Sequence, residues 1–347
     1  MPLGAVYALS AALLFGLGTP VAKLLLADVH PLMLAALLYL GSGFGLALLR
    51  VLRREASQLP RGVEWFWLAG AVLAGGVVGP VLLMLGLSGF SASGASLLLN
   101  SEAVFTALLA WFVFKENFDR RIALGMLAIV CGALVLSWPG NMRPGGGSLT
   151  SAALIVAACL AWGIDNNLTR KISLTDASFI AMSKGLSAGA VSLLLAWLAG
   201  ATLPSWVLTV QAMLLGFASY GASLVLFVLA LRHLGTARTG AYFSVAPFAG
   251  ALLAVPLLGE PVTASLLLGG LLMLVGVVLH LSERHVHEHG HTAMTHAHEH
   301  VHGDDPHHVH EHAMPVAPGE RHSHVHDHQP LRHAHAHFPD AHHRHGH

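Results

Sequence analysis

Apolar runs of about 20 residues recur along most of this 347-residue chain. A helix of that length spans the hydrocarbon core of a bilayer, which is about 30 Å thick. Charged residues make up 10% of the chain and hydrophobic types 54%, whereas about a quarter of the residues in a soluble domain are charged. The composition therefore excludes a soluble globular enzyme and predicts an all-α protein embedded in a lipid bilayer.

Hydropathy divides residues 1–282 into ten apolar segments joined by short links. In lipid the backbone groups of a segment must be hydrogen-bonded internally, and the strands of a membrane barrel would be about half as long, so the segments are predicted to be helices. The first segment lacks the positive leading region and cleavage site of a secretory signal, so we expect it to be a membrane span. The ten predicted spans are 4–26, 31–49, 65–86, 90–114, 121–138, 149–169, 177–200, 207–231, 236–258 and 262–282.

The lysine and arginine residues in the links set the expected orientation. Even-numbered links carry 11 of these residues, and odd-numbered links carry only Arg143. Links rich in lysine and arginine stay on the cytoplasmic side of a membrane. We therefore expect both termini in the cytoplasm and the chain in a bacterial inner (plasma) membrane.

The ten spans contain an internal repeat. A displacement of 144 residues aligns 85–136 with 229–280 without a gap, and a displacement of 147 aligns Phe15-Gly16 with Trp162-Gly163. Because five spans per half is an odd number, the two halves are predicted to be inserted in opposite orientations. Inverted repeats of this kind are typical of secondary transporters, whose binding site lies near the midplane between the halves. At the displacement of 144 the aligned residues include Glu116 with Glu260, Gly125 with Gly269 and Gly132 with Gly276.

The chain is thus predicted to have four parts. Two five-helix repeats, 1–138 and 149–282, are joined by the linker 139–148 and followed by the tail 283–347. The formal net charge of zero is the sum of two parts with opposite charge. Residues 1–282 hold 14 Lys+Arg and 9 Asp+Glu, whereas the tail holds 4 Arg and 9 Asp+Glu.

Two stretches of the chain resemble the EamA repeat of the drug/metabolite transporter superfamily. The first runs from Leu99-Asn100-Ser101-Glu102-Ala103 to Lys115-Glu116, and the second runs from Val245-Ala246-Pro247 to Leu258-Gly259-Glu260. The resemblance covers nearly all of residues 1–282 and implies ten helices, a central cavity and alternating access for small organic solutes, often for export. The family often has a proline where this chain has Ala103, and the second half keeps that proline as Pro247.

One acidic residue, Glu102, lies halfway along a predicted span, preceded by Asn100 and Ser101. An ionisable group inside a span costs about 2.5–3.5 kcal/mol on insertion scales, so such groups usually face a cavity or a partner. We interpret Glu102 as the proton- or cation-binding group of a transport site, with Asn100 and Ser101 beside it. The alternative is a hydrogen bond between helices that locks the bundle.

The sixth span contains the polar stretch Asp165-Asn166-Asn167. These residue types have low helix propensity because their side chains compete for backbone hydrogen bonds. The matching stretch of the first span is Gly18-Thr19-Pro20. We therefore expect both opening helices to be interrupted around a binding site, as in transporters with discontinuous helices. Asp165 has a second interpretation, an interfacial salt bridge with Arg170 or Lys171 about one turn away.

Three further groups of residues complete the predicted transport site. Lys184, in the seventh span, is expected to pair with Glu102 or Asp165 or to bind an anionic group of a solute. Tyr242, on the ninth span, is a candidate for the lining of the same cavity. Gly18, Pro20 and Pro247 are the predicted hinges, because glycine and proline weaken a helix.

Residues 283–347 hold 23 of the 26 histidines, with interspersed prolines and few large apolar residues, a composition typical of disorder. Most of these histidines alternate with other residues, so two side chains at i and i+2 can hold one Zn²⁺, Ni²⁺, Co²⁺ or Cu²⁺. The H-E-x-x-H matches in such a tract are expected by chance and do not indicate an enzyme. The predicted metal ligands are His285, His287, His289, His291, His296, His298, His300, His302, His308, His310, His312, His322, His324, His326, His328, His333, His335 and His337.

The sequence thus favours a transporter of small organic solutes with a metal-binding cytosolic tail and no required cofactor. Two alternatives stay open: a divalent-metal efflux transporter supplied by the tail, and a membrane-anchored protein that sequesters metal. Glu102 is the only acid at mid-depth of a predicted span, whereas a metal pore should have several such ligands. No basic patch with interleaved aromatics points to nucleic acid, and the sequence leaves monomer and homodimer open.

Overall fold

The structure is a computed structural model of the chain, and it describes residues 3–53, 59–114, 120–138, 149–172, 176–227, 229–230, 242–281, 286–291, 294–301, 321–328 and 331–336. The chain divides into two units, Met1–Glu283 and Arg284–His347. All described elements of the first unit are helices, as the composition predicts. Within the described residues, seven helices are long and apolar enough to cross a membrane, and three shorter apolar helices lie where the fifth, ninth and tenth spans are expected.

The helices of the first half follow the predicted spans. The third span is a continuous run of α3, the π-helical segment η1 and α4, and the fourth span consists of two helices, α5 and α6. The bounds are α1 (Leu3–Leu25), α2 (Pro31–Arg53), α3 (Glu64–Ala71), η1 (Val72–Val78), α4 (Gly79–Ser88), α5 (Ala92–Leu98), α6 (Ser101–Phe114) and α7 (Arg120–Ser137).

The second half has the same order of elements in its described part. A π-helical segment again interrupts the third helix of the half, and it begins 145 residues after η1, close to the displacement of the sequence repeat. The bounds are α8 (Leu149–Lys171), α9 (Ala177–Leu198), α10 (Trp206–Gly216), η3 (Phe217–Ala222), α12 (Ala246–Leu258) and α13 (Ala264–Leu281).

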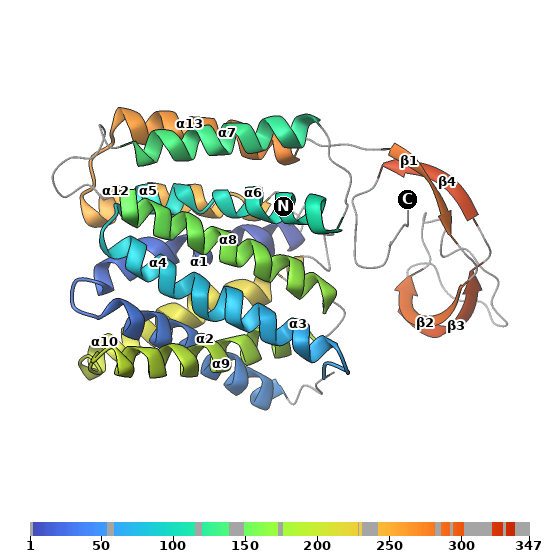
Figure 1. The fold of residues 1–347 in the computed structure, drawn as a ribbon. Helices are drawn as coiled ribbons and strands as arrows, with labels where there is room; N and C mark the ends of the chain where they lie inside the picture. Colours follow the sequence, from blue (N-terminus) through green and yellow to red (C-terminus); the bar gives the residue numbers. More distant parts are fainter. Residues whose placement is uncertain are drawn as a thin grey trace. The chain divides into compact units, whose positions relative to one another are not determined.

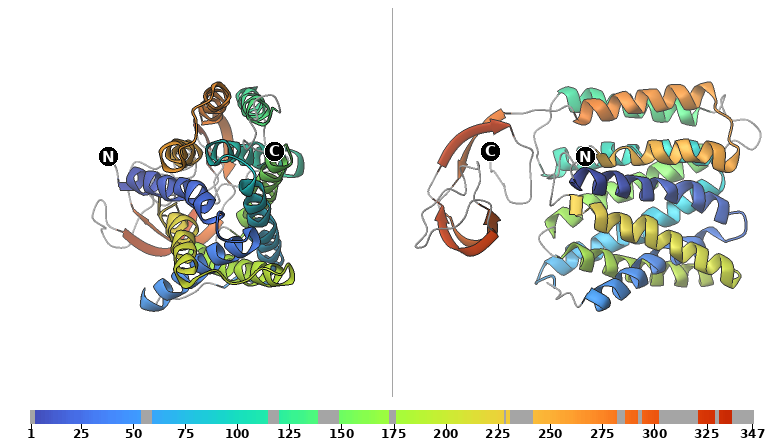
Figure 2. Two further views of the ribbon diagram at one scale, coloured as in Figure 1. Left: turned by 90° about the vertical axis from the view of Figure 1, so that its left-hand side faces the viewer. Right: turned by 180° about the vertical axis from the view of Figure 1, so that it is seen from behind.

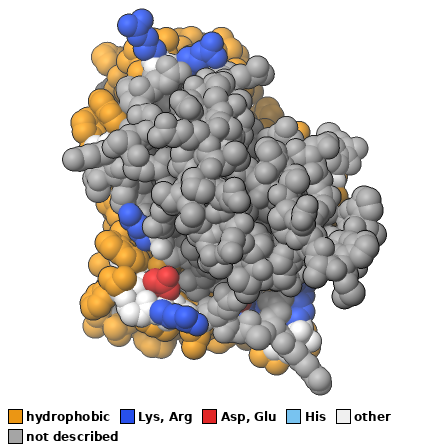
Figure 3. Space-filling view, turned by 90° about the vertical axis from the view of Figure 1, so that its right-hand side faces the viewer, with side chains coloured by type: hydrophobic (Ala, Val, Ile, Leu, Met, Phe, Trp, Pro, Cys, Tyr) orange, Lys and Arg blue, Asp and Glu red, His pale blue; other side chains and the backbone are white. Residues whose placement is uncertain are grey.

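The helices of the first unit run side by side in alternating directions (Figures 1 and 2). The start of α1 and the end of α13 lie at the same end of this bundle. The ends of α2 and α8 and the start of α7 lie there too, and blue Lys and Arg side chains are visible around the edge of this end (Figure 3). The exposed basic residues on these helix ends are Arg53, Arg120, Arg121 and Lys171. Lys115, Arg143, Arg232 and Arg238, the linker 139–148 and Glu116 lie outside the described residues.

Glycines bring α7 and α13 into backbone contact. A β-carbon at Gly132 would lie 2.8 Å from the carbonyl oxygen of Gly269, and a β-carbon at Gly276 would lie 2.6 Å from that of Gly125. The contacts are reciprocal, because Gly125 and Gly132 are the residues that the displacement of 144 aligns with Gly269 and Gly276. Small residues of this kind allow membrane helices to approach closely.

The helices α2 and α9 cross in the same reciprocal way. A β-carbon at Gly185 would lie 2.6 Å from the backbone nitrogen of Gly43, and a β-carbon at Gly43 would lie 2.8 Å from the carbonyl carbon of Gly185. At both crossings, a helix of the first half therefore packs against its counterpart in the second half.

The fourth and ninth spans are broken at equivalent places. In the fourth span, α5 ends at Leu98 and α6 begins at Ser101. In the ninth span, residues 244–245 form a turn before α12 begins at Ala246. Pro247 lies in the first turn of α12, where a missing N–H leaves no helical hydrogen bond unmade. The fourth span thus breaks although it has Ala103 in place of the proline.

The expected interruption of the two opening helices is wrong. The helix α1 continues through Gly18 and Pro20, and α8 continues through residues 165–167. Pro20 cannot donate a hydrogen bond to the carbonyl oxygen of Gly16, and that oxygen instead lies against α12, where a β-carbon at Gly250 would be 2.7 Å from it. The polar side chains of α8 find partners on neighbouring helices, so tertiary contacts override their low helix propensity.

The second unit contains four strands where the composition predicts disorder. β1 (Val286–His291) pairs antiparallel with β4 (Leu331–Ala336), and β2 (Met294–Val301) pairs antiparallel with β3 (Arg321–His328). Histidine alternates with other residues in all four segments, and a period of two is that of a β-strand.

Candidate functional site

Glu102 lies in the first turn of α6, directly after the break in the fourth span. The two residues before it, Asn100 and Ser101, are buried. The Asn100 side-chain amide donates to the carbonyl oxygen of Leu97 at 3.0 Å and so binds the last turn of α5. Asn100 therefore stabilises the break in the helix, whereas Glu102 reaches across to α8.

Asn166 of α8 binds the Glu102 carboxylate. Its Nδ2 donates to Oε1 of Glu102 at 2.7 Å and to Oγ1 of Thr106 at 3.3 Å. Asn166 is exposed and Glu102 is half-buried, so the pair is open on one side. Within the described residues Glu102 forms no ion pair, and its charge is therefore met by an amide alone.

Asp165, the neighbour of Asn166, forms an ion pair with Lys184 of α9. Nζ of Lys184 lies 2.6 Å from Oδ1 and 2.5 Å from Oδ2 of Asp165, and the two side chains are only 17% and 8% exposed. Oγ1 of Thr169 donates to Oδ1 of Asp165 at 2.9 Å. Of the partners that the sequence leaves open for Lys184, the structure gives Asp165.

The π-helical segment η1 forms the wall of this site through Gly75. A β-carbon at Gly75 would overlap the Asp165 carboxylate, so only glycine fits there. The carbonyl oxygen of Gly75 accepts hydrogen bonds from Oη of Tyr39 and from Nε1 of Trp162, both at 2.9 Å. A π-helical segment disturbs the regular hydrogen-bond ladder, and such segments are frequent at functional sites. Sequence reasoning assigned no site role to η1, Tyr39 or Trp162.

The remaining predicted residues have separate surroundings. Asn167 is buried, and its amide donates to the carbonyl oxygens of Gly163 at 2.8 Å and Thr106 at 3.2 Å, so it joins α8 to α6. Tyr242 lies before the turn of the ninth span, and no hydrogen bond of its side chain to the Glu102 site is found in the described residues. Gly18 packs against Ser219 of η3.

Each end of the bundle has a polar contact between the two halves. At the end where α2 finishes, Nη1 of Arg50 lies 2.7 Å from Oδ2 of Asp176, the N-cap residue of α9. At the opposite end, the Glu260 carboxylate accepts hydrogen bonds from the backbone nitrogens of Ala92 at 2.6 Å and Ser93 at 2.9 Å. Sequence reasoning assigned no site role to these contacts and used Glu260 only as a match in the repeat.

The described residues contain no group of three or more His, Cys, Asp and Glu side chains placed to hold a metal ion. Twelve of the predicted tail ligands lie in strands, and six lie outside the described residues. The strand residues are His287, His289, His291, His296, His298, His300, His322, His324, His326, His328, His333 and His335, and the others are His285, His302, His308, His310, His312 and His337.

Comparison with known proteins decides the family. The profile of the EamA-like transporter family matches residues 2–138 and 149–282. The chain belongs to this family. An uncharacterized transporter of Methanothermobacter thermautotrophicus is 28% identical over 293 residues, which cover 80% of this chain and 85% of the relative. A solved crystal structure of a protein has the same fold, with a TM-score of 0.61 and 17% identity over 80% of this chain and 95% of that one.

The Asp165–Lys184 pair gives a stability prediction for this membrane transporter. Replacement of one partner leaves the other charged and buried, so Asp165→Asn and Lys184→Met should each lower the free energy of unfolding by about 3–5 kcal/mol. The double variant should lose less than either single variant, because no unpaired charge remains. Thermal unfolding of the four proteins in detergent, followed by tryptophan fluorescence, measures this. Additive losses would contradict the pairing.

Proposed function

We propose that the protein is a secondary active exporter of small organic solutes that works by alternating access of two inverted halves. The observation that carries the proposal is the charge balance of the polar site on α6, α8 and α9. Asp165 and Lys184 neutralise each other, and in the described part of the chain the Glu102 carboxylate is bound by an amide and by no cation. The site therefore has one negative charge to offer to a proton or to another cation.

The position of Glu102 supports this role over a purely structural one. A carboxylate turned toward acyl chains would be costly, and intramembrane acids usually face a cavity or a partner. The open side of the Glu102–Asn166 pair is consistent with an aqueous path to the carboxylate. Asn166 and Thr106 would orient the carboxylate, while Asp165 and Lys184 hold α8 against α9.

The packing of the helices supports the inverted repeat. Counterpart helices cross each other with reciprocal glycine contacts, and the breaks and π-helical segments recur at equivalent positions of the two halves. In such an arrangement each half can adopt the shape of the other, which moves the access path from one side to the other. The Arg50–Asp176 and Glu260–α5 contacts join the halves at opposite ends, and we propose that they open in turn.

The orientation follows from the basic helix ends. Because the exposed arginines and lysines lie at the end where α1 begins and α13 finishes, we propose that this end and both termini face the cytoplasm of a bacterial cell. The polar site would then be reached from the cytoplasm for loading and from the outside for release.

Uptake into proteoliposomes tests the coupling role of Glu102. A panel of small organic solutes is screened with and without a pH gradient, and a gradient of one unit can support about tenfold accumulation per coupled proton. We expect Glu102→Gln to abolish the effect of the gradient, because the amide cannot bind a proton. Glu64→Gln is the control, since Glu64 lies at the surface and accepts from the backbone of Arg61 at 2.8 Å. Gradient-driven uptake by Glu102→Gln would contradict the proposal.

We propose further that the tail binds transition-metal ions. The register pairs His287 with His335 in one sheet and His298 with His324 in the other, and imidazole is a good ligand for Zn²⁺, Ni²⁺, Co²⁺ and Cu²⁺. The tail would buffer or sense metal for the cell, while the solute crosses through the bundle.

Removal of the tail separates this role from metal transport. Calorimetric titration with Zn²⁺ should show several bound ions for the full chain and none for a chain that ends at Glu283, whereas solute uptake without metal should be unchanged. Equal Zn²⁺ binding by both chains, together with Zn²⁺ movement into proteoliposomes, would favour the metal-efflux alternative.

A further inference from the structure

A buried serine without a hydrogen-bond partner lies between α1, α5 and α12. Ser96 of α5 is 1% exposed, and its hydroxyl has no partner in the described part of the chain. Nearly all buried polar groups in native proteins have a partner, so an orphaned hydroxyl calls for an explanation. Its oxygen faces α12, because a β-carbon at Gly250 would lie 2.7 Å from it.

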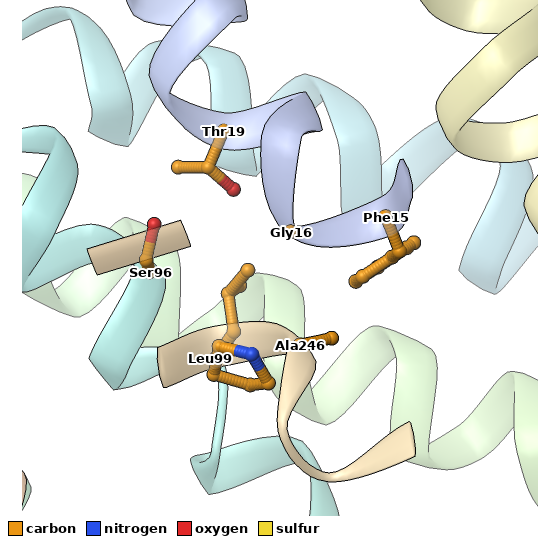
Figure 4. Close-up of a pocket in the computed structure, with 7 residues that line it drawn as sticks. Phe15, Gly16, Thr19, Ser96, Leu99 and Ala246 are labelled. Atoms are coloured by element: carbon orange, nitrogen blue, oxygen red, sulfur yellow. The ribbon is translucent and has the colours of Figure 1, made fainter. Parts of the chain in front are cut away.

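Ser96 lines a small pocket, which we call the Ser96 pocket (Figure 4). Thr19 of α1 carries a second hydroxyl among the lining residues, and the other lining side chains are apolar. All the residues that line it are uncharged, and the space left between them is too small for a water molecule. Water therefore cannot satisfy Ser96 in this conformation. The lining consists of Phe15, Thr19, Ser96, Leu99, Ala246 and Pro247, together with the backbone of Gly16.

The pocket lies at the counterpart of the Glu102 site. Ala246 stands 144 residues after Glu102, and Thr19 stands 147 residues before Asn166, as the two displacements of the repeat require. The crossing of α1 with α12 also corresponds to that of α8 with α6. Gly16 packs against Gly250 at the first crossing, and Gly163 packs against Thr106 at the second. Where the Glu102 site has a carboxylate and an amide, the Ser96 pocket has two hydroxyls and an alanine.

We infer that the Ser96 pocket binds the uncharged end of the transported solute, a hydroxyl, carbonyl or amide group attached to a small apolar body. The inference rests on the proposed function, because the pocket must widen when α1 and α12 move apart during transport. A free hydroxyl can both donate and accept, so the Ser96 side chain suits any of these neutral groups. A charged end of the solute has no counter-charge among the lining residues of the pocket. We expect such a group to bind at the Glu102 site instead.

Ser192 of α9 provides a matched control. Its hydroxyl is also buried and without a partner among the described residues, but it does not line the pocket. Ser192→Ala and Ser96→Ala therefore remove the same group from the same kind of surroundings. If both serines are merely structural, the two variants should behave alike in every measurement.

The experiment uses the full chain in lipid nanodiscs and four unbranched probes of four carbons each: butyramide, 1-butanol, n-butylamine and butyrate. The shift in unfolding temperature is recorded against probe concentration. We expect the neutral probes to raise the unfolding temperature of the wild type and of Ser192→Ala. For Ser96→Ala, the same shift should require a roughly tenfold higher concentration of either neutral probe. The two charged probes should act equally on all three proteins.

Equal responses of Ser96→Ala and Ser192→Ala to the neutral probes would overturn the inference, and so would the absence of any shift with them. The result for the Ser96 pocket can be distinguished from the result for the proposed function. A neutral-probe effect that depends on Ser96, in a protein whose uptake ignores the pH gradient, would reject only proton coupling. Gradient-driven uptake that Glu102→Gln abolishes, without a Ser96-dependent shift, would reject only the neutral subsite.

Discussion

The pairing of charge inside the helix bundle determines the arrangement of its centre. Lys184 and Asp165 lie on different helices, and neither can be left alone in a medium of low dielectric without a large loss of stability. Their contact holds α9 against α8. It also requires Gly75, because any side chain at that position would displace the carboxylate. Asp165 is the next residue to Asn166, so the same pair fixes the position of the amide that binds Glu102.

Close helix packing brings these residues together. Glycine contacts at the α7–α13 and α2–α9 crossings let backbones from the two halves touch, and they do so reciprocally. The breaks in the fourth and ninth spans then turn the residues that follow toward α8 and α1. One break is followed by Glu102 and the other leads to Ala246 and Pro247. The residues after the two breaks thus differ in chemistry, an acidic residue in α6 and uncharged residues in α12.

Hydropathy predicted the helices of the bundle, because a bilayer requires long apolar segments. The acidic residue of the site could also be found from sequence, since Glu102 stands alone in an apolar run. The ion-pair partner of Lys184 could not be predicted from sequence. Glu102, Asp165 and an anionic group of a solute all remained candidates, because the choice depends on which helices are neighbours. Local propensity failed at Pro20. The carbonyl oxygen of Gly16, which has no helical donor because Pro20 lacks an N–H, lies against α12. The π-helical segments have no recognised sequence pattern and were missed.

The central claim is that the Glu102–Asn166 pair faces an aqueous path that opens to each side of the membrane in turn. Thr106, which accepts a hydrogen bond from Asn166, is the position from which to measure this. In a chain with Cys131 and Cys159 replaced by alanine, Thr106→Cys is treated with a membrane-impermeant thiol reagent in right-side-out and in inside-out vesicles. The account predicts labelling from both sides, whereas labelling from one side only, or from neither, would contradict it.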